Sequence, residues 1–155
     1  MNPPFPTPDA PAPTPVRERW AAQPRPVRWA LIAYLAGFAQ GTAAHVLDIA
    51  TGGIHAYTSL GPPAMQAFYL SLVVLDPLVV LLVSRVRPPG IVLAATVMAA
   101  DVTANWITNW PMLRDDPTWF LRPVGLLPIT LFGVFVTATA IPLHRSVAAS
   151  APPPR

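Results

Sequence analysis

The sequence predicts an all-α integral membrane protein, a four-helix bundle of four transmembrane helices with disordered, proline-rich ends. Two observations predict this fold. Only 11% of the 155 residues are charged and 53% are hydrophobic, whereas a soluble domain carries about 25% charged residues. The hydrophobic residues gather in four runs that approach the roughly 20 residues a helix needs to cross the hydrocarbon core. Since a chain in lipid must satisfy its own backbone hydrogen bonds, we expect these runs to be helices.

The spans divide the chain into a membrane domain and two tails. Residues 1–26 are dense in proline and lack apolar periodicity, so we expect a disordered tail. A secretory signal is disfavoured, because the apolar run that follows is too long for one. Residues 27–144 are the predicted transmembrane domain, and residues 145–155 a second disordered tail. The four spans are expected at about residues 28–50, 65–84, 90–110 and 124–143.

The arginines predict the orientation of the chain. All ten basic residues are arginines, and only Arg114 and Arg122 fall on one side of the predicted bundle. The other side holds Arg17, Arg19, Arg25, Arg28, Arg85, Arg87, Arg145 and Arg155. Under the positive-inside rule the second side is cytoplasmic, so we expect a multi-pass protein of the cell membrane with both termini in the cytoplasm. Tryptophans fall near both predicted boundaries, as an aromatic belt would.

Composition also excludes several kinds of function. The chain has no cysteine, which excludes disulfides, thiolate metal sites and cysteine nucleophiles. The net charge of +3 does not indicate a nucleic-acid partner, because the arginines lie at the ends of apolar runs. We expect no cofactor and no metal site. The expected partner is the lipid bilayer, with a homodimer if the protein forms a transport path.

Polar residues interrupt the apolar runs. They are Gln40, His45, Asp48, Asp76, Asp101, Asn105 and Asn109. An ionisable side chain near the bilayer centre costs about 2.5–3.5 kcal/mol to insert, so such groups usually face the bundle interior. Asp101, Asn105 and Asn109 share one helix face through their spacing of four residues. The two asparagines and Gln40 are most simply explained by contacts that hold helices together.

Helix rise gives each polar residue an approximate depth. Counted from the predicted inner ends, Asp76 lies about 13 Å deep, Asp101 about 16 Å, His45 about 25 Å and Asp48 about 30 Å. The polar residues therefore begin near the midplane and continue outward. If they share a cavity, we expect it to open away from the cytoplasm.

The first span also carries a small-residue face. Gly37 and Gly41 form a G-x-x-x-G pattern, which lets another helix approach closely. His45 follows at the same spacing, and Asp48 lies three residues further on. We therefore expect His45 and Asp48 at a helix contact, either as a structural pair or as an acid–base pair in which the carboxylate holds the imidazole tautomer.

Asp76 and Asp101 are the central candidates. Two close carboxyls cannot both stay charged without a partner, and the predicted spans contain no internal arginine. Either one carboxyl is protonated, or a cation is bound, or His45 and water reach them. Pro77 follows Asp76 directly, and a kink there would leave a free carbonyl beside the carboxyl.

The layout resembles the small four-helix membrane domains of the sterol-isomerase and sigma-2-receptor type. Those domains also place acidic and amide residues in a bundle cavity. The segments HVLDIATGG (45–53), LVVLDP (72–77) and AADVTANW (99–106) have the character of family signatures. No functional residue is carried over from the resemblance.

The leading hypothesis is a protein that binds or transports a small molecule, a cation or a proton. Its site would consist of Asp76, Asp101, His45, Asp48 and Asn105. One alternative is an enzyme on a lipid-soluble substrate, with either buried carboxyl as acid or base. The other is a structural or accessory subunit, whose polar residues only specify helix pairing.

Overall fold

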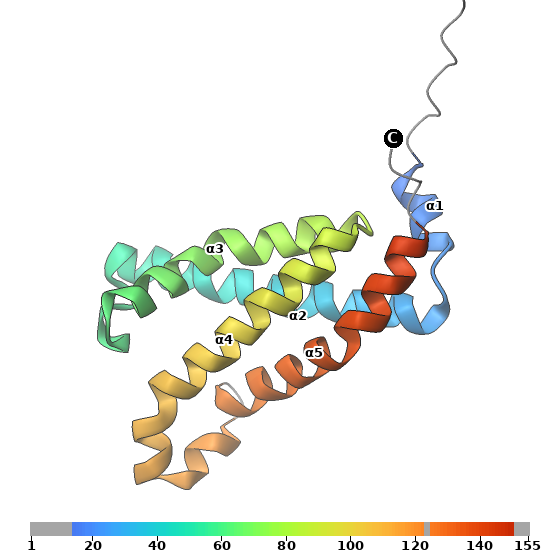
Figure 1. The fold of residues 1–155 in the computed structure, drawn as a ribbon. Helices are drawn as coiled ribbons and strands as arrows, with labels where there is room; N and C mark the ends of the chain where they lie inside the picture. Colours follow the sequence, from blue (N-terminus) through green and yellow to red (C-terminus); the bar gives the residue numbers. More distant parts are fainter. Residues whose placement is uncertain (1–13, 123–124, 151–155) are drawn as a thin grey trace, which may run out of the picture.

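The computed structural model describes residues 14–122 and 125–150, and all regular structure within them is helical (Figure 1). A short helix, α1 (Val16–Ala21), precedes four long ones: α2 (Arg25–Gly52), α3 (Pro63–Ser84), α4 (Pro88–Asp115) and α5 (Leu126–Ala149). Short 3-10 turns lie in the connections: η1 (Gly53–His55), η2 (Thr58–Leu60) and η3 (Pro117–Leu121). All four long helices are long and apolar enough to cross a membrane. The predicted number and type of the long elements is confirmed.

Proline marks where helices begin. Pro63 and Pro88 each occupy the first position of their helix, where the missing N–H group would have no intrahelical partner. Proline inside a helix does not end it in this chain. α3 runs through Pro77 as one continuous helix, and α4 passes Pro111 and ends at Asp115 rather than near residue 110.

The predicted tails are corrected where the structure describes them. Residues 14–26 were expected to be disordered, but they contain α1 and the first two residues of α2. Residues 145–149, assigned to the second tail, belong to α5. The remaining parts of both predicted tails, residues 1–13 and 151–155, lie outside the described residues.

Long-range hydrogen bonds hold α1 against the bundle. Trp20 Nε1 donates to the carbonyl of Ser84 over 2.7 Å. Gln23, in the turn after α1, donates to Ser150 Oγ over 2.8 Å and accepts from Ser146 Oγ over 2.9 Å. These partners lie 64 to 127 residues away in the sequence. A reading of local periodicity therefore could not anticipate this ordered helix.

The long helices pack as two hairpins. α2 lies along α3, α4 lies along α5, and α3 joins the hairpins by packing against α4. Figure 1 shows the hairpins diverging at their left-hand ends, away from α1. At the arginine-rich end the core is apolar, with Leu31, Val79 and Val136 fully buried. The Tyr34 hydroxyl is satisfied there by donating to the Val136 carbonyl over 2.7 Å.

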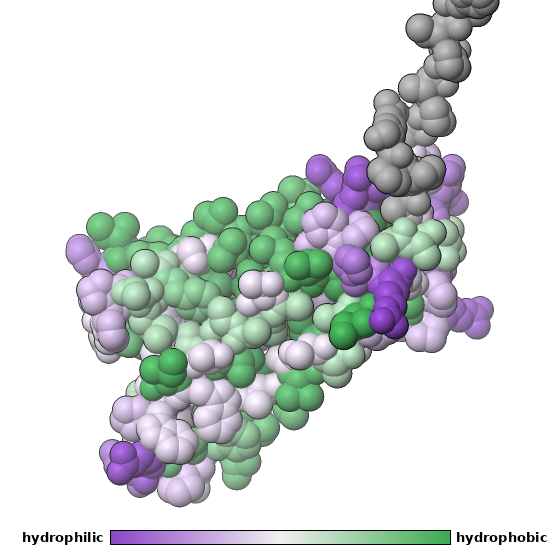
Figure 2. All heavy atoms as spheres, viewed as in Figure 1, coloured by the Kyte–Doolittle hydropathy of each residue, from purple (hydrophilic) through white to green (hydrophobic). Residues whose placement is uncertain are grey.

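The outer surface carries many large apolar side chains. Trp29 is 70% exposed, and Val74 and Val134 are each 63% exposed. On the face drawn in Figure 2, hydrophobic residues cover the middle and hydrophilic ones gather at the ends. This is the distribution expected of helices that face lipid along their middle and water at their ends.

Candidate functional site

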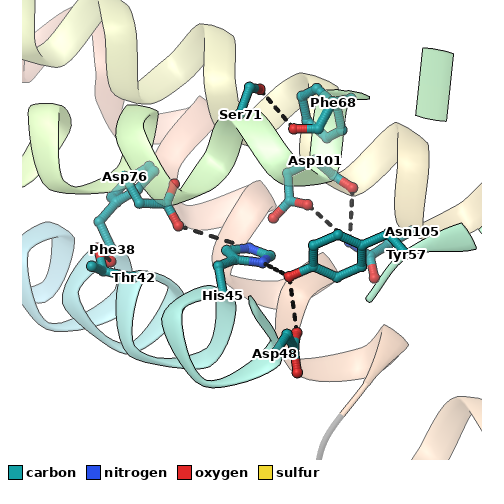
Figure 3. A network of polar contacts seen from close by, with 10 residues as sticks. All are labelled: Phe38, Thr42, His45, Asp48, Tyr57, Phe68, Ser71, Asp76, Asp101 and Asn105. Carbon is teal, nitrogen blue, oxygen red and sulfur yellow. Dashed lines mark hydrogen bonds and ion pairs between the residues drawn. The ribbon is translucent and has the colours of Figure 1, made fainter. Parts of the chain in front are cut away.

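Seven polar and aromatic residues meet where α2, α3, α4 and the connection after α2 come together; Figure 3 shows all of them except Tyr69, whose ring lies beside those of His45 and Tyr57. We call this group the polar cluster. Its members are His45, Asp48, Tyr57, Tyr69, Asp76, Asp101 and Asn105. All five candidates predicted from the sequence are present, and Tyr57 and Tyr69 are additional members.

A glycine on α2 makes room for the carboxyl of Asp76. Asp76 lies on α3 and is only 5% exposed. A Cβ atom built at Gly41 would lie 2.5 Å from Asp76 Oδ2, which is closer than real Cβ contacts come. Gly37 of the same pattern faces the ring of Phe132 on α5. Each glycine of the G-x-x-x-G pattern therefore makes room for a side chain of a neighbouring helix, Asp76 of α3 at Gly41 and Phe132 of α5 at Gly37.

Tyr57 bridges the predicted pair of His45 and Asp48. The Tyr57 hydroxyl donates to Asp48 Oδ2 over 3.0 Å and lies 2.8 Å from His45 Nδ1. The hydroxyl has a single proton, and an ionised carboxylate can only accept. When that proton points to Asp48, the Nδ1–H group of His45 must donate to the tyrosine oxygen. Nε2 is then the unprotonated nitrogen of a neutral His45.

His45 Nε2 faces the buried carboxyl of Asp76. The distance to Asp76 Oδ2 is 4.0 Å, which is longer than a direct hydrogen bond and short enough for an ion pair when His45 is protonated. A neutral His45 beside a protonated Asp76, and a charged His45 beside an ionised Asp76, differ only in the position of one proton.

This contact corrects the predicted depths, which placed His45 about 12 Å further out than Asp76. The predicted depths were counted from the inner end of each span, as if the helices began at one level and ran parallel. The structure does not meet that assumption. His45 lies 20 residues from the start of α2 at Arg25, whereas Asp76 lies eight residues from the end of α3 at Ser84. At a rise of about 1.5 Å per residue, α2 must extend well beyond α3 at the arginine-rich end or be tilted against it.

Asp101 and Asn105 form a pair within α4. The Asn105 amide donates to Asp101 Oδ1 and to the Asp101 carbonyl, each over 3.0 Å, and Asp101 is 9% exposed. Asn109 donates to the Asn105 carbonyl over 2.9 Å and accepts from Trp119 Nε1 over 2.9 Å. The predicted contact between helices is therefore found for Asn109, which joins α4 to η3, whereas the described hydrogen bonds of the Asn105 side chain lie within α4.

Aromatic rings enclose the cluster. Tyr57 stacks on Tyr69 with ring centroids 5.4 Å apart, and His45 meets Tyr57 edge-on at 6.0 Å. Burial raises the pKa of the Tyr57 phenol, and the hydrogen bond to Asp48 and the nearby charges, including that of Asp101, raise it further. Tyr57 therefore stays protonated at neutral pH and remains a hydrogen-bond donor.

The sequence analysis missed both tyrosines for different reasons. Tyr69 lies seven residues before Asp76, so it shares the buried face of α3 and could have been found by that spacing. Tyr57 lies in a connection without regular periodicity. Its position depends on how the chain folds back over α2, and we find no local signal that indicates it.

A pocket of about 380 Å³ reaches the cluster from the end opposite the arginines. Asp48 and Tyr57 line it together with Thr51, Gly52, Ala56 and Leu60. Asp48 itself is exposed. Of the polar cluster, only Asp48 and Tyr57 line this pocket; that the cavity opens away from the cytoplasm stays a prediction.

Two other observations limit what the cluster can be. Gln40, expected inside the bundle, is exposed on α2, so it is not a member. Within residues 14–122 and 125–150, no three His, Asp or Glu side chains are grouped closely enough to hold a metal ion.

In comparisons with known proteins, no family model, no curated protein and no solved structure matches this chain. The resemblance to sterol-isomerase and sigma-2-receptor domains gains no support from them. What the protein does must therefore be inferred from the polar cluster.

Proposed function

We propose that this chain is a multi-pass protein of the cell membrane whose polar cluster binds a small organic cation from the outer side in exchange for protons. Both termini lie in the cytoplasm in this proposal. Its main support is the buried carboxyl of Asp76, which faces His45 at 4.0 Å, while Tyr57 connects His45 to the exposed Asp48.

The surface of the bundle supports insertion in this orientation. The exposed tryptophans Trp29 and Trp110 lie toward opposite ends of the long helices, where aromatic side chains favour the lipid–water interface. The described arginines concentrate at the α1 end, which the positive-inside rule assigns to the cytoplasm.

Cysteine labelling tests the orientation directly, because the chain has no cysteine of its own. Ser59→Cys lies in η2, and Ala149→Cys lies at the end of α5; both positions are exposed. A membrane-impermeant maleimide added to intact cells should label Ser59→Cys and spare Ala149→Cys until the cells are opened. The reverse labelling would overturn the orientation, and equal labelling would overturn insertion as four spans.

The cluster offers a route by which a proton leaves the buried carboxyl. The 4.0 Å gap between the two side chains closes to hydrogen-bond distance, and the Asp76 O–H proton passes to His45 Nε2. The Nδ1–H proton then passes to the Tyr57 oxygen as the Tyr57 hydroxyl proton moves to the Asp48 carboxylate. Asp48 releases that proton to water at the outer pocket. At the end His45 and Tyr57 are again neutral and Asp48 is again a carboxylate. Asp76 has lost one proton and is left as the anion.

An organic cation is the ligand that suits this surrounding best. An anionic Asp76 beside Asp101 requires a compensating positive charge. The rings of Tyr57 and Tyr69 lie beside that of His45, which faces Asp76, and the faces of such tyrosine rings attract ammonium groups by roughly 0.5–2 kcal/mol. A bare metal ion would use more carboxylate or imidazole ligands than the cluster groups together.

The apolar core at the arginine-rich end favours binding over passage through the membrane. Beyond Asp76 toward α1, the buried side chains include Val79 and Val83 from α3 and Leu31 from α2. Apart from the Tyr34 hydroxyl, which already bonds the Val136 carbonyl, the buried side chains of this core are apolar and give a cation no anionic partner along a further path. We therefore propose access from one side, as for a receptor site or the outward-open half of a transport cycle.

Proton release on binding tests the proposal. Methylammonium is added to purified protein in lipid nanodiscs, in weakly buffered solution with a pH-indicator dye, between about pH 5 and about pH 8, where histidine titrates. Wild type should release protons with a saturable dependence on methylammonium, and Asp76→Asn should release none. Asp115→Asn, the same change at an exposed aspartate at the end of α4, is the control and should behave as wild type.

Failure of methylammonium, guanidinium and sodium alike to release protons from wild type would refute the proposal. The accessory-subunit alternative predicts a further result. If Asp76→Asn and Asp101→Asn lose thermal stability at every pH, the carboxyls serve folding. Our proposal predicts that both variants are at least as stable as wild type without ligand, because each removes a buried ionisable group.

A further inference from the structure

Three arginines are brought together at the end of the bundle opposite the pocket. Arg19 lies on α1, and Arg85 and Arg87 flank the turn between α3 and α4. The hydrogen bond from Trp20 Nε1 to the Ser84 carbonyl, 2.7 Å long, fixes the two segments against each other. Since Trp20 follows Arg19 and Ser84 precedes Arg85, this bond brings the three arginines to one end of the bundle, where the charges of Arg87 and Arg85 act on Arg19. We call these three residues the arginine triad.

No described carboxylate neutralises the triad. Among residues 14–122 and 125–150, the contact between His45 and Asp76 is the one acid–base pair within 4.0 Å. The Nε atom of Arg19 is buried without a hydrogen-bond partner among the described residues. Partial burial and then the charges of Arg87 and Arg85 lower the pKa of Arg19, which is the mark of a cation held close to like charges.

The turn between α3 and α4, which holds two of these arginines, has a strained backbone at Val86. Val86 has a φ of 51°, a left-handed conformation that a β-branched residue rarely adopts. Val86 is 3% exposed and packs in the core. Its burial fixes the position of the turn, and with it the backbone of Arg85 and Arg87. Strain of this kind costs about 1–3 kcal/mol and persists where the surrounding structure imposes it.

We propose that the arginine triad binds the phosphate of an anionic phospholipid headgroup. The triad sits at the boundary between the apolar surface and the charged end of the bundle, where headgroups lie. A phosphodiester supplies the missing negative charge and accepts hydrogen bonds from several guanidinium groups at once. A lipid is favoured over dissolved phosphate because the bilayer holds it next to the site at high effective concentration.

Lipid selectivity measured by native mass spectrometry tests this site. Full-length protein is equilibrated with vesicles of equimolar phosphatidylglycerol and phosphatidylcholine, and the ratio of the two lipids is read from the species that retains one lipid. Wild type should favour phosphatidylglycerol. Arg19→Gln should lower that preference about tenfold, because it removes a hydrogen-bonding guanidinium together with its charge. Arg87→Gln should act in the same direction.

The matched control is Arg17→Gln, which removes an exposed arginine from the same helix. General attraction to an anionic surface is worth about fivefold per basic residue, so this variant should lose no more than that. Equal losses for Arg17→Gln and Arg19→Gln would overturn the site in favour of diffuse attraction. Displacement of phosphatidylglycerol by excess inorganic phosphate would overturn the lipid as the ligand.

A stability measurement separates lipid binding from a structural role. In nanodiscs of phosphatidylcholine alone, Arg19→Gln should be as stable as wild type or more so, because one of three mutually repelling charges is gone. Added phosphatidylglycerol should then stabilise wild type and not the variant. A variant that is unstable in both lipids would show that Arg19 serves folding, and the proposal would be wrong.

Discussion

Replacing Tyr57 by phenylalanine removes one hydroxyl group from the centre of the polar cluster and keeps the ring. The ring still stacks on Tyr69, 5.4 Å away, so the packing term should change little. Two hydrogen bonds are lost, to His45 at 2.8 Å and to Asp48 at 3.0 Å. Asp48 is exposed and can bond water instead, whereas His45 is largely enclosed.

The magnitude follows from these two environments. A hydrogen bond contributes about 1 kcal/mol net, and a buried group left without a partner costs about 1–3 kcal/mol. The His45 side chain is 14% exposed, so its Nδ1–H group should bear most of the cost. We expect Tyr57→Phe to lower the free energy of unfolding by about 2 kcal/mol.

Reversible unfolding in mixed micelles, followed by circular dichroism, provides the measurement. Tyr69→Phe is the matched control, because its hydroxyl makes only a long 3.4 Å contact with Thr108 and should cost less than about 1 kcal/mol. Proton release on methylammonium binding should slow in Tyr57→Phe and not in Tyr69→Phe. Equal stability and equal release rates in the two variants would refute the bridging role of Tyr57.

Three further predictions concern the same contacts. Gly41→Ala should cost about 1–3 kcal/mol and weaken proton release, because its methyl group must push the Asp76 carboxyl aside; unchanged release with bound methylammonium would contradict the close approach. Burial raises the pKa of Tyr57 above its ordinary 10.0, so the folded state holds the phenol proton more tightly than the unfolded state. The resulting stabilisation is complete below about pH 10 and is lost as the pH rises further. The free energy of unfolding, measured against pH, should therefore fall less at high pH in Tyr57→Phe than in wild type. Trp20→Phe removes the 2.7 Å bond to Ser84 and should cost about 1 kcal/mol while exposing α1 to limited proteolysis; unchanged cleavage would show that α1 does not depend on that bond.

The sequence was sufficient to predict the long helices because the physics involved is local. Four apolar runs have the length of a span, and the structure contains a long helix at each. The burial of Asp76 and Asp101 was equally predictable, since a carboxyl facing lipid is costly. Both residues are buried as expected.

The rest depended on contacts between distant parts of the chain. The order of α1 depends on Ser84, Ser146 and Ser150, which no local pattern connects with Trp20 and Gln23. Counting residues along each span could not reveal that α2 extends beyond α3 or is tilted against it, so the predicted depths of His45 and Asp76 differed by too much. Those relations require the packed bundle.

The central claim is that the buried carboxyl of Asp76 gives up its proton when a cation binds. Infrared difference spectroscopy in nanodiscs observes this directly, because the carbonyl stretch of a protonated carboxyl is distinct from the bands of the carboxylate. On addition of methylammonium, wild type should lose protonated-carboxyl absorption and gain carboxylate absorption, and Asp76→Asn should show neither change. An unchanged spectrum in wild type, or the full change in Asp76→Asn, would contradict the claim.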